Sequence, residues 1–131
     1  PPYGDHIDYS DNPECIGKLS AYDPAYYRAM HRVIREAARV LEPGGVLGLY
    51  VCDYFEKKHG FAPVGFQLFV SIAESLSILD ILSVARHNKS LEMGNYRKAA
   101  EEGNFFLRGF NYLFIAEKPK NTPGSGQKRR R

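Results

Sequence analysis

Apolar residues follow a helical period in the first half of this chain of 131 residues. Between residues 24 and 42 they recur every three to four positions, and arginines take the other faces, which predicts an amphipathic helix. Asp23 can accept hydrogen bonds from the free N–H groups of the first turn, and Pro24 suits the first helical position. Pro43 and the glycines at 44–45 predict the end of the helix and a tight turn.

Short apolar runs elsewhere predict strands. The run from Val46 to Cys52 is almost wholly apolar, as is typical of a strand buried on both faces of a parallel sheet. The other expected elements are a polar break (53–62), a helix from Pro63, a strand (78–85), a polar insertion (87–103) with a short helix (95–102), and a last strand (111–117).

This order of elements predicts an α/β fold with a Rossmann-like, mostly parallel sheet. Only seven residues separate Gly103 from the run that begins at Asn111. A hairpin with the preceding strand is therefore expected, which would make the last strand antiparallel. Three strands and two helices do not complete a doubly wound sheet. An upstream half with more strands would cover the exposed sheet edge.

Composition excludes several classes of protein. Hydrophobic residues make up 44% and charged residues 25%, which is ordinary for a globular domain. No stretch of about 18 uncharged apolar residues is present, so we expect no membrane span. The two cysteines, Cys15 and Cys52, match no metal-ligand spacing and are too few for a disulfide scaffold. A reduced, cytoplasmic location is the default expectation.

The net charge of +3 comes from one end of the chain. Residues 118–131 hold six basic residues and no acidic one, whereas the remainder holds 12 basic and 15 acidic residues. We therefore expect a globular unit over residues 1–118 and a disordered basic tail over 119–131. The tail could contact nucleic-acid phosphates, or it could be a solvated terminus.

The most informative motif is Pro1-Pro2-Tyr3-Gly4. Two prolines fix the backbone and leave carbonyl groups free to accept hydrogen bonds, and an aromatic ring directly after them can stack on a planar ring. Such a group suits the exocyclic amine of a nucleobase. The alternative interpretation is a proline-rich turn with an exposed tyrosine.

Together with Leu41-Glu42-Pro43-Gly44-Gly45 and the run from Tyr112 to Lys118, this motif resembles the C-terminal half of class I S-adenosylmethionine-dependent methyltransferases. The resemblance covers residues 1–118 and is greatest to the DNA methyltransferases that modify adenine N6 or cytosine N4. It implies S-adenosylmethionine as cofactor, DNA as partner, and direct attack of the amine nitrogen on the methyl carbon. It also implies a target base turned out of the stack.

Residue by residue, the resemblance gives Pro1, Pro2 and Tyr3 catalytic positions. The prolines would help to hold the amine, and Tyr3 would stack on the base. The polar residue that precedes the prolines in the family is absent here, and so is a glycine-rich cofactor loop. The chain thus resembles the substrate-facing half of such an enzyme, and its cofactor-binding residues are unknown.

Further substrate contacts are expected close to the motif and at one strand end. Gly4, Asp5 and His6 follow Tyr3 directly. For the cluster of Asp5, His6 and Asp8 we favour a solvated or substrate-contacting loop over a metal site. Asp53 and Tyr54 end the predicted strand 46–52, and ligands of open α/β sheets lie beyond the carboxyl ends of strands. A simple strand-ending turn is the alternative for these two residues.

Two other functions stay open at this stage. One is an RNA methyltransferase that acts on a base amine such as guanine N2, since those enzymes also use Pro-Pro-Tyr. The other is a non-catalytic nucleic-acid-binding or assembly module with the same fold. An upstream glycine-rich loop would favour an enzyme over the module.

Overall fold

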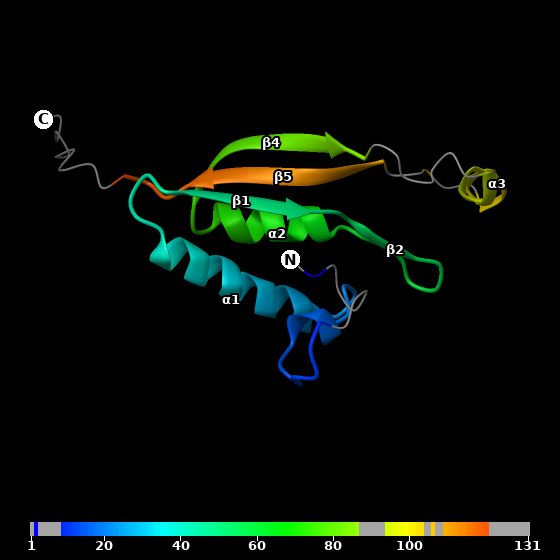
Figure 1. Cartoon of the computed structure of the whole chain (residues 1–131), viewed down its shortest axis with the longest axis horizontal. Helices are drawn as coiled ribbons and strands as arrows, with labels where there is room; N and C mark the ends of the chain where they lie inside the picture. Colours follow the sequence, from blue (N-terminus) through cyan, green and yellow to red (C-terminus); the bar gives the residue numbers. More distant parts are fainter. Residues whose placement is uncertain (1, 3–8, 87–93, 104–105, 107–108, 121–131) are drawn as a thin grey trace, which may run out of the picture.

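The structure is a computed structural model, which describes residues 2, 9–86, 94–103, 106 and 109–120 (Figure 1). Its elements in chain order are a 3-10 helix η1 (Ile16–Lys18), α1 (Pro24–Val40), β1 (Val46–Val51), β2 (Tyr54–Glu56), β3 (Gly60–Ala62), α2 (Val64–Ala73), β4 (Ser77–Ala85), α3 (Gly94–Gly103) and β5 (Phe110–Glu117).

The main sheet has the strand order β1-β5-β4, and β5 runs antiparallel to both neighbours. The expected α/β fold and the antiparallel last strand are confirmed, but the expectation of a mostly parallel sheet is wrong. The last strand enters between the other two, so each hydrogen-bonded pair of this sheet contains it. β1 and β4 still run in the same direction because both oppose β5.

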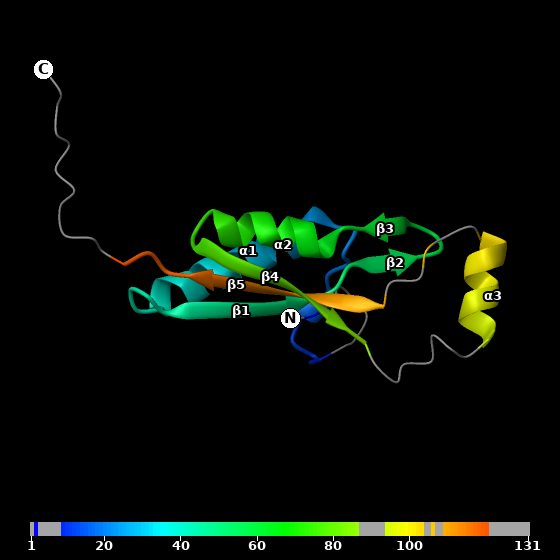
Figure 2. The ribbon, with the colours of Figure 1, turned by 90° about the horizontal axis from the view of Figure 1, so that it is seen from above.

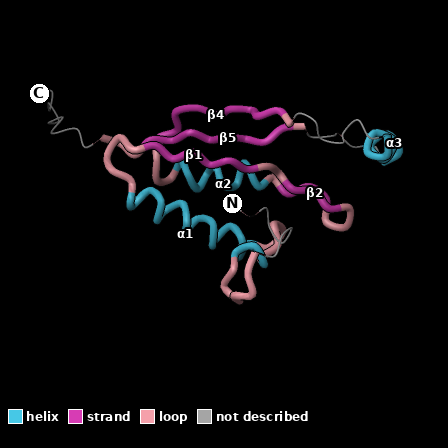
Figure 3. The backbone as a smooth tube through the Cα atoms, in the orientation of Figure 1, coloured by secondary structure: helices cyan, strands magenta, loops and turns pink. Residues whose placement is uncertain are grey.

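Most predicted elements lie within two residues of their expected bounds, and the short helix of the insertion is present as α3. Figure 3 shows α3 beyond the ends of β4 and β5, apart from the other helices. The hairpin of β2 and β3 was not expected in the polar break. It closes at Gly60, whose φ of 83° lies in the left-handed region that favours glycine.

Helices α1 and α2 lie on the same face of the sheet (Figure 2). Along β1 the side chains alternate, so that Val51 is buried while Val46 and Tyr50 stay 53% and 40% exposed. Burial of this strand on both faces is therefore not observed, because within the described residues no element covers the opposite face.

The core lies between the two helices and the sheet. α1 and α2 both contribute to it, and the strands add residues such as Val51 and Phe114. Burial of each large apolar side chain stabilises the fold by about 1.5–3 kcal/mol. The residues of the helices that are almost fully buried are Tyr26, Ala29, Met30, Ile34, Val64, Leu68 and Ile72. The same core cluster includes Val51 at the carboxyl end of β1.

Candidate functional site

The carboxyl ends of β1 and β4 lie at the same edge of the sheet as the first residues of β5. Asp53, Arg86 and Tyr112 lie at this edge, which we call the carboxyl edge. Ligands of open α/β sheets bind beyond the carboxyl ends of the strands. The edge is therefore where a site is expected on topological grounds.

Asp53 joins three elements at the carboxyl edge. Its Oδ1 accepts a hydrogen bond from the backbone N–H of Gly65 at 2.9 Å, in the first turn of α2. Its Oδ2 accepts from the hydroxyl of Tyr112 in β5 at 3.1 Å. The side chain therefore fixes the end of β1 against α2 and β5. Its predicted contact with substrate stays a prediction.

Gly65 lets Tyr112 lie directly against the start of α2. A Cβ atom at this position would come within 2.5 Å of Cδ2 of Tyr112 and within 3.3 Å of Oδ1 of Asp53. The Tyr112 ring also stacks on Phe114 with an interplanar angle of 11°. Asp53, Gly65 and Tyr112 thus form one close-packed unit, which we call the edge triad.

Tyr54 lies in β2, where its ring centre is 5.7 Å from that of Tyr22. The Tyr22 hydroxyl donates to the carbonyl of Gly60 at 2.6 Å and accepts from the N–H of Glu56 at 2.9 Å. These bonds hold the β2–β3 hairpin against the loop that precedes α1. Tyr54 therefore packs against Tyr22 beside this hairpin. Its role in substrate binding stays a prediction.

Within the motif at the start of the chain, the structure describes Pro2. The hydroxyl of Tyr26 in α1 donates to the carbonyl oxygen of Pro2 at 2.6 Å, and Tyr26 itself is fully buried. The helix therefore holds Pro2 against the first turn of α1. The other predicted motif and loop residues lie outside the described residues: Pro1, Tyr3, Gly4, Asp5 and His6.

A surface hollow of about 450 Å³ opens beside Pro2, and Tyr9, Cys15, Ile16 and Gly17 also line it. Tyr9 is 56% exposed. The volume of the hollow lies in the range of small-molecule sites. The sequence pattern did not single out Tyr9 or Tyr26, because their place beside Pro2 depends on the tertiary fold.

Tyr27 of α1 lies close enough to Asp53 for the carboxylate charge to act on its phenol. Its hydroxyl donates to the carbonyl of Ala21 at 2.7 Å. Burial raises the pKa of Tyr27 above its usual value of 10.0, and the negative charge of Asp53 and the nearby Tyr22 raise it further. The phenol therefore stays neutral beside Asp53 over the physiological pH range.

Arg86 is held in place at the end of β4. Its Nε donates to Oδ1 of Asn111 at 2.7 Å, and the Asn111 amide donates to the hydroxyl of Tyr50. Asn111 is the buried polar residue on the uncovered face, at 7% exposure. The sequence places Arg86 after a strand, but it cannot show that two other strands fix its guanidinium.

Within the described residues, no three histidine, cysteine, aspartate or glutamate side chains lie together as metal ligands would. No described helix has both the length and the apolar character needed to cross a bilayer.

Comparison with solved structures identifies the fold. No family model matches this chain, and no curated protein matches it. Structures of a "putative DNA modification methylase" from Thermus thermophilus do match. Its selenomethionine derivative aligns with a TM-score of 0.58 and 23% identity over 81% of this chain and 42% of that chain. Its complex with S-adenosyl-L-methionine aligns with a TM-score of 0.56 and 22% identity, with the same coverage.

This chain has the fold of part of a methyltransferase. At this identity the likeness concerns the fold, and the chain spans about two fifths of the length of the methylase structures. The complex shows that S-adenosyl-L-methionine binds to a protein of this fold.

Proposed function

We propose that this chain is the base-facing part of a DNA methyltransferase that transfers a methyl group from S-adenosylmethionine to adenine N6 or cytosine N4. The observation that carries the proposal is the position of Pro2. A buried tyrosine of α1, Tyr26, donates its hydroxyl hydrogen bond to the Pro2 carbonyl, and Pro2 lines an open hollow. Likeness in fold to a DNA modification methylase supports the same interpretation.

The proposed work of this chain is to bind and orient the target base. With the Pro2 carbonyl bonded to Tyr26, the neighbouring Pro1 carbonyl is the proposed acceptor for the amine, and Tyr3 the proposed stacking partner. In this proposal, a base turned out of the DNA duplex enters the hollow beside Pro2. Correct placement of the reacting amine supplies a large part of the rate increase in such a reaction.

The sequence of this chain contains no glycine-rich cofactor loop. Asp53, the carboxylate at the end of β1, already accepts from Gly65 and Tyr112. The described glycines with positive φ angles, Gly44 and Gly60, lie in the turn before β1 and at the first position of β3. In our proposal, residues beyond this chain hold most of the cofactor.

Methyl transfer by an intact protein that contains this chain tests the proposal. Duplex DNA is incubated with S-adenosylmethionine that carries a labelled methyl group, digested to nucleosides and analysed by mass spectrometry. Labelled N6-methyldeoxyadenosine or N4-methyldeoxycytidine is expected. Label found only in RNA incubated in parallel would instead indicate the base-amine RNA methyltransferase, and no label in either would indicate a non-catalytic module.

Two neighbouring tyrosines of α1 provide a matched pair of variants for that assay. Tyr26→Phe removes the hydrogen bond to Pro2, and Tyr27→Phe removes a hydrogen bond of similar length to Ala21. Tyr26→Phe should lower kcat about tenfold with little change in KM for the cofactor, because the amine is less well placed. Equal activity of the two variants would contradict a role for Tyr26 in positioning the motif.

A further inference from the structure

Four arginines form a line along the outer surface of α1. Arg28, Arg32, Arg35 and Arg39 are all exposed and follow one another at spacings of four, three and four residues. At 3.6 residues per turn, this spacing places them within about 60° of helix surface and over about 16 Å of its length. We call this line the arginine stripe.

The stripe is a local concentration of positive charge on an acidic body. α1 holds these four arginines and one acidic residue, Glu36. The rest of residues 1–117 holds 8 basic and 14 acidic residues. Diffuse solubilising charge would not produce this distribution, because it would spread both signs over the surface.

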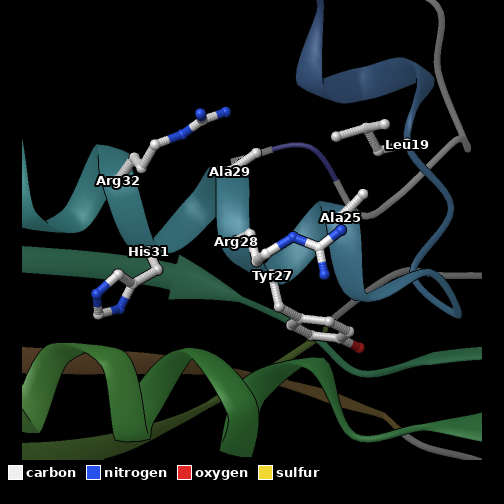
Figure 4. Close-up of a pocket in the computed structure, with 7 residues that line it drawn as sticks. All are labelled: Leu19, Ala25, Tyr27, Arg28, Ala29, His31 and Arg32. Atoms are coloured by element: carbon white, nitrogen blue, oxygen red, sulfur yellow. The ribbon is translucent and has the colours of Figure 1, made fainter.

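Among the described residues, one arginine of the stripe has an acidic partner. Glu36 pairs with Arg39 at 2.7 Å. Within the described part of the chain, Arg28, Arg32 and Arg35 make no ion pair. Figure 4 shows Arg32 on the side of α1 opposite the sheet and α2, while the Tyr27 ring turns toward α2.

The surface between these arginines is hollowed. One open hollow of about 710 Å³ includes Arg28 and Arg32 in its lining (Figure 4), and a second of about 420 Å³ is lined by Arg32, Arg35, Glu36 and Arg39. Guanidinium groups beside an open surface can form paired hydrogen bonds to the oxygens of a phosphate.

From this geometry we infer that the arginine stripe binds the phosphate backbone of a nucleic acid, outside the proposed site for the target base. A line of about 16 Å is long enough to follow several successive phosphates, which are about 3.4 Å apart along the axis for each strand. Binding at this surface does not depend on methyl transfer, so it can be tested separately from the proposed function.

A membrane surface fits this stripe less well than a nucleic acid. A helix that lies in a membrane interface must insert its apolar face. The apolar face of α1 is already buried in the core, through Tyr26, Met30 and Ile34. The stripe therefore offers charge without an apolar face to insert.

The test is salt-dependent DNA binding by the full 131-residue chain. Fluorescence anisotropy of a labelled duplex of about 25 base pairs is measured from about 50 to 200 mM NaCl. The variant Arg28→Gln/Arg32→Gln/Arg35→Gln should bind at least tenfold more weakly at about 50 mM, and its slope of log affinity against log salt should be shallower by up to about 2.7. The matching lysine variant should keep most of the wild-type slope.

A control variant removes the same charge from separate elements, by Lys18→Gln, Lys57→Gln and Lys98→Gln, all exposed. It should change the salt slope much less than the stripe variant, and circular dichroism should show the same fold for both. Equal slopes for the two variants would overturn the inference. Absence of DNA binding by the wild type would also overturn it. The same holds if the stripe variant loses binding to phosphatidylserine vesicles but keeps its binding to DNA.

Discussion

The edge triad makes a sharp prediction at Gly65. In Gly65→Ala, the new methyl group would lie within 2.6 Å of two ring atoms of Tyr112. The backbone is not the obstacle, since the left-handed glycines of the described chain are Gly44 and Gly60. The tyrosine ring must therefore move, and it would carry with it the hydrogen bond to Asp53 and the stacking on Phe114.

The change in the stability of Gly65→Ala is the balance of one stabilising and two destabilising effects. Alanine is preferred over glycine in a helix by about 1 kcal/mol, which would stabilise the variant. Overpacking in a dense region costs about 1–3 kcal/mol, and weakening the hydrogen bond from Tyr112 costs about 0.5–1.5 kcal/mol more. A net loss of about 0.5–3.5 kcal/mol in the free energy of unfolding follows. This corresponds to a fall in Tm of roughly 2–13 °C for a domain of this size.

Gly48→Ala is the matched control for thermal unfolding followed by circular dichroism. A Cβ at Gly48 would meet Leu113 at 3.7 Å, an ordinary contact, so its Tm should stay within about 2 °C of wild type. In a double-mutant cycle, Gly65→Ala should lower the free energy of unfolding less in the Tyr112→Ala background than in wild type. Equal Tm values for Gly65→Ala and Gly48→Ala would refute the close packing described for the edge triad.

The remaining predictions concern three variants and the isolated chain. Tyr27→Phe should lose about 0.5–1.5 kcal/mol of stability near neutral pH. In wild type, the pKa of Tyr27 is raised in the folded state, so above about pH 10 the phenol ionises in the unfolded chain first and the free energy of unfolding falls. Tyr27→Phe lacks this phenol, so its free energy of unfolding should fall less steeply with pH. Urea unfolding at several pH values measures the difference. The isolated chain should bind S-adenosylmethionine at best weakly, and micromolar binding by calorimetry would contradict this. In an intact enzyme, Tyr3→Ala should lower methyl transfer about tenfold or more. If the tail contacts phosphates, deletion of residues 120–131 should make the salt slope of DNA binding shallower without changing sequence preference, whereas an unchanged slope would indicate a solvated terminus.

The helices and strands were predictable because their signals are local. Asp23 does accept from the N–H of Ala25 at 2.8 Å and begins α1, as its position before Pro24 predicts. The arrangement of the sheet was harder to predict from the sequence, because strand order depends on contacts between residues that are distant along the chain. An apolar run such as Val46–Val51 suits a strand beside parallel or antiparallel neighbours alike. The hydrophobic periods therefore predict the elements, but they could not place β5 between β1 and β4.

The candidate site was predictable in position more than in detail. That Asp53 ends a strand can be read from the sequence, and the topological rule then places it at the carboxyl edge. Its partners cannot be read in this way, because Gly65 and Tyr112 are 12 and 59 residues further along the chain. The same holds for Tyr26, which the sequence pattern did not single out and whose hydroxyl lies 2.6 Å from the Pro2 carbonyl. A buried tyrosine must find a partner for its hydroxyl, and here that partner belongs to the motif with the strongest functional signal. Packing of α1 and the position of the proposed base-binding motif are therefore coupled, so that changes in the core beneath Tyr26 should alter activity as well as stability.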